Sequence, residues 1–253
     1  MTAAKTDNPL VRKFSLLLQL SDQEEEILRH LQENCEEIPE KTDLLRSGED
    51  YPCTFIIKEG WAYSYKLLED GQQQVLSYWL QGDFIGLFAT VFRKAEYSVR
   101  TLTDVSVCRI RPEQIMKVFS DSPLLAAAIC WTVARDGAIL REHVTRIGRR
   151  NAYERTGHLL LELLGRLEAV GLVDKNAFEF PITQELLADT LGLTPVHVNR
   201  TLKALKKDGM IDYDVNTIVI INRIGLIEKT GFDPSYIKMT QLPEALESSF
   251  GND

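Results

Sequence analysis

The stretch that most constrains the fold runs from residue 181 to residue 222 and reads PITQELLADTLGLTPVHVNRTLKALKKDGMIDYDVNTIVIIN. Its apolar residues recur at helical spacing, which predicts a first short helix with an inward face. That face is formed by Ile182, Leu186, Leu187 and Leu191. Thr183 stands where a side-chain oxygen would cap the helix, and Gly192 can leave it with a positive φ.

A second short helix follows directly. Thr194 is its expected N-cap, and Val198, Leu202 and Leu205 form its inward face. Two short helices around a tight turn predict a helix-turn-helix, whose second helix can enter a DNA major groove. The apolar runs 210–213 and 217–221, on either side of Asp214-Val215-Asn216, predict a β-hairpin wing.

The outer surface of this motif supplies the predicted DNA-binding residues. The segment from Thr194 to Lys207 holds four Lys or Arg residues and no acid, although the whole chain carries a net charge of −8. DNA contact depends on the local charge rather than on the total, so we expect this segment to bind DNA. The predicted DNA-binding residues are Thr183, Gln184, Thr194, Val196, His197, Asn199, Arg200, Lys203 and Lys206.

Composition places the chain among globular proteins. It has 253 residues, 44% of them hydrophobic and 26% charged, which is enough for two modest domains. No apolar run approaches the length of a membrane span, and the N-terminus lacks the apolar core of a signal peptide. We therefore predict a cytoplasmic protein that does not contact a membrane.

The four cysteines are Cys35, Cys53, Cys108 and Cys130. They contain no C-x-x-C pair, and their spacing favours neither a disulfide framework nor a zinc finger. We predict four reduced and mostly buried thiols.

The first half of the chain changes pattern near Pro39. Residues 8–36 are predicted to be helical, with a capping box over residues 21–24. Between about Pro39 and Pro112, short strands alternate with Gly/Asp turns such as Asp70-Gly71, which predicts a small β-barrel or jelly roll.

One unusually long helix is predicted over residues 122–150. Val133, Leu140, Val144 and Ile147 recur near a 3.5-residue spacing, which favours pairing with a second copy of the helix. The alternative is a helix buried against its own domain. Five arginines cluster toward its end, either as a solvated face or as positive charge for DNA phosphates: Arg141, Arg146, Arg149, Arg150 and Arg155.

Together these segments predict an α+β chain. Residues 1–121 form N-terminal helices and a β-roll domain, residues 122–150 a dimerisation helix, and residues 151–222 a winged helix-turn-helix domain that opens with an amphipathic helix over 151–168. Residues 223–253 are acidic and weakly patterned, so we predict an appendage that is partly ordered at best.

This order of elements resembles the CRP/FNR family of bacterial transcription regulators. The residues that carry the resemblance are the segments 82–86 (GDFIG), 153–160 (YERTGHLL) and 182–221. The resemblance covers roughly residues 10–222 and implies a cyclic-nucleotide-binding-like β-roll and a homodimer bound to pseudo-palindromic DNA. RNA polymerase would be a further partner if the protein is an activator.

The recognition helix differs from that of many family members. Arg200 matches the family's base-reading arginine and keeps the chemistry for a bidentate contact with guanine. Val196 stands where many members have a glutamate that accepts from cytosine, and it offers only apolar contact. We therefore expect an operator different from that of the familiar members.

The β-roll, in which members of the family sense their signal, differs further from the familiar members. Family members that bind cyclic nucleotides place a glutamate after the Phe-Ile-Gly turn and an Arg-Ser pair later, whereas this chain has Leu87 and Tyr97-Ser98 at these places. Arg100 is nearby in the sequence. We therefore do not expect cyclic AMP, and the effector stays unidentified.

Other cofactors of the family are not expected either. An iron–sulfur cluster would need clustered N-terminal cysteines, and all four histidines lie outside the β-roll, which disfavours a haem or another metal.

Two alternatives to a DNA-binding regulator remain open. The winged helix could serve protein contacts, or the β-roll could belong to a cupin-like enzyme, although no catalytic residues or His-rich ligand set support an enzyme.

Overall fold

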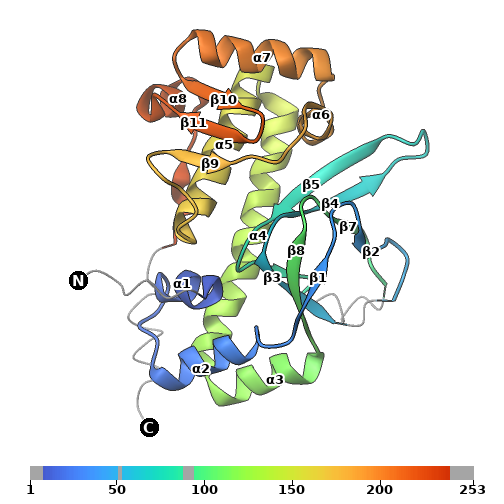
Figure 1. Ribbon diagram of the computed structural model, residues 1–253, viewed down its shortest axis with the longest axis vertical. Helices are drawn as coiled ribbons and strands as arrows, with labels where there is room; N and C mark the ends of the chain where they lie inside the picture. Colours follow the sequence, from blue (N-terminus) through green and yellow to red (C-terminus); the bar gives the residue numbers. More distant parts are fainter. Residues whose placement is uncertain (1–7, 51–52, 88–93, 240–253) are drawn as a thin grey trace. The chain divides into compact units, whose positions relative to one another are not determined.

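The computed structural model describes residues 8–50, 53–87 and 94–239 (Figure 1). The chain divides into two compact units. Among the described residues, the first comprises residues 8–50, 53–62, 78–87, 94–136 and 239, and the second comprises residues 63–77 and 137–238.

The first unit opens with two short helices rather than one helical region. They are α1 (Pro9–Ser15), which Asn8 caps, and α2 (Asp22–His30), which begins with the predicted capping box of Ser21 and Glu24. The prediction of helix to residue 36 is wrong at its end, because Cys35–Ile38 forms strand β1. A short stretch after α2 thus connects a helix to the edge of a sheet.

The β-roll is confirmed as two four-stranded sheets. One sheet has the order β1-β8-β3-β6 and the other the order β2-β7-β4-β5. The strands are β2 (Asp43–Leu45), β3 (Thr54–Glu59), β4 (Ala62–Leu67), β5 (Gln73–Trp79), β6 (Phe84–Ile85), β7 (Ser98–Thr101) and β8 (Val105–Ile110). Gly71 adopts a φ of 82° in the predicted turn between β4 and β5, a conformation that glycine adopts without strain.

Two apolar clusters form the core of the first unit. One holds alternate residues of the β-roll strands, including Phe55, Ile57, Val99 and Val107. The other joins the helices to the opposite face of β3 and β8, which contributes Ile56 and Cys108 among others.

A buried ionic cluster surrounds Asp83, in the Gly82-Asp83-Phe84 turn. Lys13 Nζ donates to Asp83 Oδ1 at 2.5 Å and to the Gly82 carbonyl oxygen at 2.7 Å. Arg135 Nη2 donates to the same carboxylate oxygen at 2.9 Å. Burial, followed by the neighbouring Arg135, lowers the pKa of Lys13 to about 8. The turn that identifies the β-roll in the sequence is thus fixed by cations from α1 and from the long helix.

The long helix is confirmed as α4 (Pro123–Arg149), and it follows a helix that the sequence did not predict, α3 (Pro112–Asp121). By length and composition alone, α4 could cross a membrane, since one 18-residue window has a mean hydropathy of 1.4. The prediction that no apolar run approaches this length is therefore wrong. About a third of that window is buried inside the protein.

The cysteines also differ from the prediction. Cys35 and Cys108 form a disulfide, while Cys53 and Cys130 are free and Cys130 is exposed. The two bonded cysteines are 73 residues apart in sequence but are direct partners in the β1–β8 register. Spacing along the chain gave no sign of this pairing, because only the sheet brings the two strands together.

The second unit contains the winged helix. Its elements are α5 (Ala152–Ala169), β9 (Ala177–Glu179), α6 (Gln184–Leu191), α7 (Pro195–Lys207), β10 (Ile211–Asp214), β11 (Thr217–Ile220), α8 (Arg223–Thr230) and the 3-10 helix η2 (Pro234–Tyr236). Helix α5 packs against α6, α7 and α8 (Figure 1).

The prediction of a C-terminal appendage, partly ordered at best, is wrong for residues 223–238, which are ordered and packed. Helix α8 ends at Gly231, and the side chains of Phe232 and Ile237 are buried. A Cβ atom at Gly165 would lie 2.6 Å from the Ile237 side chain, which shows how closely this segment packs on α5. Residues 240–253 lie outside the described part of the chain.

A second buried ionic cluster joins α4, α5 and this C-terminal segment. Arg146 is 1% exposed and pairs with Glu162, and its Nε donates to His158 Nδ1 at 3.3 Å. Tyr236 donates its hydroxyl hydrogen to Glu162 at 2.8 Å. Burial, and next the Arg146 guanidinium, lower the pKa of His143 to about 4 and that of His158 to about 2.

Candidate nucleic-acid interface

The first helix of the motif, α6, begins and ends as the sequence predicts. Thr183 Oγ1 accepts a hydrogen bond from the Leu186 backbone N–H at 3.2 Å. Gly192 ends the helix with a φ of 62°. Both termini are therefore fixed by the residue types that these positions favour.

The second helix, α7, is positioned by its apolar face. Thr194 Oγ1 accepts from the His197 backbone N–H at 3.3 Å, and Pro195 occupies the first turn. Val198, Leu202 and Leu205 are buried, as predicted, and Thr201 is buried beside them. Burial of this face leaves the other side of α7 at the surface.

The predicted DNA-binding residues lie on that exposed side and on the adjoining end of α6. The exposed members are Thr183, Thr194, Val196, His197, Arg200, Lys203 and Lys206, and the half-buried members are Gln184 and Asn199. The Val196 side chain is 68% exposed, although it is apolar. An exposed valine at this place is suited to an apolar contact such as a thymine methyl group.

Two of these residues contact each other. Asn199 Nδ2 donates to Gln184 Oε1 at 3.1 Å, so the amide of the recognition helix is fixed by α6. The sequence placed both residues in the interface but did not reveal their contact.

Lys206 pairs with a residue of the wing. Its Nζ lies 2.5 Å from Asp212 Oδ1 and 5.2 Å from the centre of the Tyr213 ring. The hydrogen bond with Asp212 raises the pKa of Lys206 and lowers that of Asp212. Lys203 and Arg200, in contrast, have no ion pair among the described residues.

The wing has three strands rather than two. The predicted hairpin is present as β10 and β11, with Asp214 opposite Thr217 at its turn. Strand β9, which the sequence did not predict, pairs with β11. Val215 is 89% exposed at the tip of the hairpin, where it could reach a partner.

The arginines near the end of α4 divide into two groups. Arg146, Arg150 and Arg155 have partners within the protein. Arg150 donates to the Thr230 carbonyl, and Arg155 Nη1 donates to the Leu191 carbonyl at 2.9 Å. Arg141 and Arg149 are exposed. The interpretation of the five arginines as one surface cluster is therefore wrong.

In the β-roll, Arg100 points away from the apolar interior. Its Nε and Nη2 donate to the two carboxylate oxygens of Asp43 at 2.7 and 3.1 Å. The preceding residue, Val99, belongs to the interior cluster. Leu87 is buried, at the place where the related nucleotide-binding proteins have a glutamate.

Known protein families match both halves of the chain. Residues 35–122 match the cyclic nucleotide-binding domain, and residues 154–229 match the Crp-like helix-turn-helix domain. The second match ends inside α8, so it includes the first part of the segment beyond the wing.

Individual proteins are similar over most of the chain. The nitrogen fixation regulation protein FixK of Bradyrhizobium diazoefficiens is 32% identical over 167 residues, which are 65% of this chain and 69% of FixK. The transcriptional activator protein FnrL of Cereibacter sphaeroides is 29% identical over 191 residues, covering 74% of this chain and 76% of FnrL. The structure of FixK2 from Bradyrhizobium japonicum has a TM-score of 0.68 at 25% identity and covers 77% of this chain and 96% of FixK2.

Proposed function

Since this chain belongs to the CRP/FNR family of DNA-binding transcription regulators, we propose that it reads a pseudo-palindromic operator as a homodimer, without cyclic AMP. DNA binding and dimeric action are properties of the family. The reading residues, the dimer contact and the independence from cyclic AMP are specific to the proposal.

The observation that carries the proposal is the exposed side of α7. Arg200 is exposed and has no ion pair among the described residues, so its guanidinium is available for the O6 and N7 atoms of guanine. Asn199 lies one residue earlier with its amide already oriented by Gln184. Lys203 and Lys207 follow along the helix, where they would bind phosphates.

The exposed apolar residues of α4 support dimerisation through this helix. Leu140 is 44% exposed and Val144 is 60% exposed, while the residues directly before them, Ile139 and His143, are buried on the adjacent face, about 100° around the helix. A water-exposed apolar stripe on a 27-residue helix is stabilised when a second copy covers it. Two recognition helices would then enter successive major grooves about 34 Å apart.

Two features of the β-roll support independence from cyclic AMP. Arg100 is paired with Asp43, and Leu87 replaces the expected glutamate. A cyclic phosphate buried beside these residues would lack a charge partner, which is strongly unfavourable.

We also place the protein in the cytoplasm, where its DNA is, and we assign the apolar length of α4 to protein contact rather than to a membrane. Leu125, Ala128 and Ile129 of α4 already pack in the core of the first unit. No catalytic activity is part of the proposal, and RNA polymerase is the expected further partner if the protein activates transcription.

The proposal is tested by selecting bound duplexes from a randomised DNA pool. We expect an inverted repeat with half-site centres about one helical turn apart. Titration of the selected duplex, followed by fluorescence anisotropy, should give the same affinity with and without cyclic AMP. A tenfold tighter complex with cyclic AMP would refute the independence, and the absence of any selected sequence at low salt would favour a winged helix that binds protein.

A further inference from the structure

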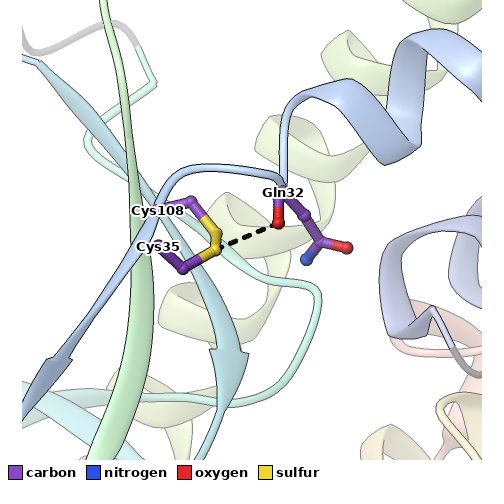
Figure 2. The surroundings of a disulfide bond; sticks show 3 residues. All are labelled: Gln32, Cys35 and Cys108. Atoms are coloured by element: carbon purple, nitrogen blue, oxygen red, sulfur yellow. Dashed lines mark hydrogen bonds between the residues drawn. A yellow bond between two sulfur atoms is a disulfide. The ribbon is translucent and has the colours of Figure 1, made fainter.

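The disulfide of the first unit lies where a helix meets the β-roll. Cys35 is the first residue of β1, and Cys108 lies opposite it in β8, with the two Cα atoms 4.0 Å apart (Figure 2). Two thiols at directly opposed positions of an antiparallel pair are close enough to bond without a change of fold. The reduced and the oxidised forms can therefore share this β-roll.

We propose that Cys35 and Cys108 form a reversible redox site, oxidised to the disulfide by a hydroperoxide and reduced again by a dithiol. The reversibility rests on the proposed cytoplasmic location, because disulfides in that compartment are usually transient and redox-sensing. The chemistry of the pair itself can be tested without DNA.

The surroundings of Cys35 suit both redox states. Cys35 Sγ lies 3.3 Å from the Gln32 carbonyl oxygen (Figure 2). A thiol can donate its hydrogen to that oxygen, whereas a disulfide sulfur has no hydrogen to donate. Reduction therefore adds one hydrogen bond, from the Cys35 thiol to the Gln32 backbone carbonyl oxygen.

The two cysteines differ in solvent exposure, which determines which sulfur reacts with the peroxide first. Cys35 is half-buried, whereas Cys108 is fully buried in the core cluster. The Cys35 thiolate would attack a peroxide oxygen, breaking the O–O bond to give a sulfenic acid and, with one proton, water. The Cys108 sulfur would then attack the Cys35 sulfur and expel a second water. For hydrogen peroxide, two thiols lose two electrons to one peroxide and two waters form.

The charge around Cys35 favours a small neutral oxidant. Glu33, Glu36 and Glu37 are close in sequence and exposed, and Arg109 pairs with Glu36. Carboxylates close to Cys35 repel an anionic disulfide such as oxidised glutathione, but they do not repel hydrogen peroxide, which is neutral.

The bond would fix α2 and β1 to the rest of the first unit. Ser122, directly before α4, donates its hydroxyl hydrogen to Glu24 of α2 at 2.7 Å. With the disulfide formed, the α2–β1 segment is held to the start of α4 at one end and to β8 at the other. We therefore expect the oxidised first unit to unfold at a higher temperature than the reduced one.

The test uses the purified full chain, reduced and then exposed to equimolar hydrogen peroxide. We expect the number of free thiols to fall from four to two, since Cys53 and Cys130 are free in the structure. Peptide mapping without reductant should recover Cys35 linked to Cys108, thioredoxin should restore all four thiols, and the thermal midpoint should follow the redox state.

Matched variants separate this pair from general thiol oxidation. Cys130→Ser removes the exposed free cysteine and should leave the response unchanged, whereas Cys35→Ser should abolish it. Cys35→Ser alters the half-buried partner, so the test does not depend on a change at the buried Cys108. The proposal is overturned if four thiols persist after peroxide, if Cys53 or Cys130 forms the bond, or if thioredoxin fails to reduce it.

Discussion

Asn199 Nδ2 donates a hydrogen bond to Gln184 Oε1 at 3.1 Å, so the recognition helix and the helix before it share one amide pair. This contact leaves the Asn199 Oδ1 and one N–H for a base. An asparagine can pair with the N6 and N7 atoms of adenine through those two groups. The contact therefore fixes the orientation of the side chain before DNA arrives.

We predict that Asn199→Ala weakens discrimination at one base pair of each half-site by about 1–3 kcal/mol. Gln184→Ala should weaken discrimination at the same base pair by less, because it removes only the orienting contact. Anisotropy titrations with operators altered at single positions measure both effects. If the two variants affected different base pairs, the contact would have no role in reading.

The two lysines of α7 should contribute differently. Lys203 has no ion pair among the described residues, whereas Lys206 pairs with Asp212. Lys203→Ala should weaken binding to all duplexes and reduce the slope of log K against log salt by about 2. Each phosphate contact contributes about 0.9 to that slope, and both protomers carry the change.

Lys206→Ala should have a smaller effect than Lys203→Ala, because Asp212 already neutralises the Lys206 ammonium. Asp212→Asn serves as the matched control. It frees the ammonium and should strengthen binding at low salt. A larger loss from Lys206→Ala than from Lys203→Ala would show that the ion pair with Asp212 opens on DNA.

Dimerisation depends on the exposed stripe of α4. We predict that the double variant Leu140→Asp and Val144→Asp is monomeric in sedimentation equilibrium and loses operator binding. Two carboxylates placed in a buried seam would be desolvated without partners. Arg141→Ala, on the same helix and exposed, is the control and should remain dimeric. A dimeric double variant would place the dimer contact elsewhere.

Stability should fall below about pH 6.5 because two buried histidines are neutral in the folded protein. Their folded pKa values, about 4 for His143 and about 2 for His158, lie below the value of about 6.5 expected in the unfolded chain. The unfolded chain therefore binds more protons as the pH falls from 6.5 toward 4, and each histidine lowers the unfolding free energy by about 1.4 kcal/mol per pH unit.

Urea denaturation between pH 7 and pH 4.5 measures this dependence. His158→Gln removes one titrating group and should reduce the slope by about half, even though it also lowers stability at pH 7. His30→Gln changes an exposed histidine and is the matched control. An unchanged slope for His158→Gln would mean that this histidine is already accessible to protons in the folded state.

The sequence predicted those elements whose pattern is local. The winged helix-turn-helix, the long helix and the β-roll each follow from apolar spacing and from turn residues such as Gly192 and Gly71. Strand β9 escaped prediction because its three residues are too few to show an alternating pattern. The ordered conformation of residues 223–238 was not predicted, because it depends on the burial of Phe232 and Ile237, the latter against a helix distant in sequence.

Long-range pairing explains the remaining differences. Charged residues are usually exposed, so nothing in the sequence marked Lys13 or Arg146 as buried. Each is buried beside a carboxylate from another element, Asp83 for Lys13 and Glu162 for Arg146. The Cys35–Cys108 bond and the Asn199–Gln184 contact are likewise products of the fold rather than of local spacing.

The central claim is that α7 reads DNA bases through Arg200, and one measurement tests it most directly. The affinities of the native protein and of Arg200→Ala are compared on the selected operator and on every single-base variant of one half-site. We predict that Arg200→Ala loses about 1–3 kcal/mol of discrimination at a single G·C pair and keeps its preferences elsewhere. Equal weakening on all duplexes, with every preference retained, would contradict the claim.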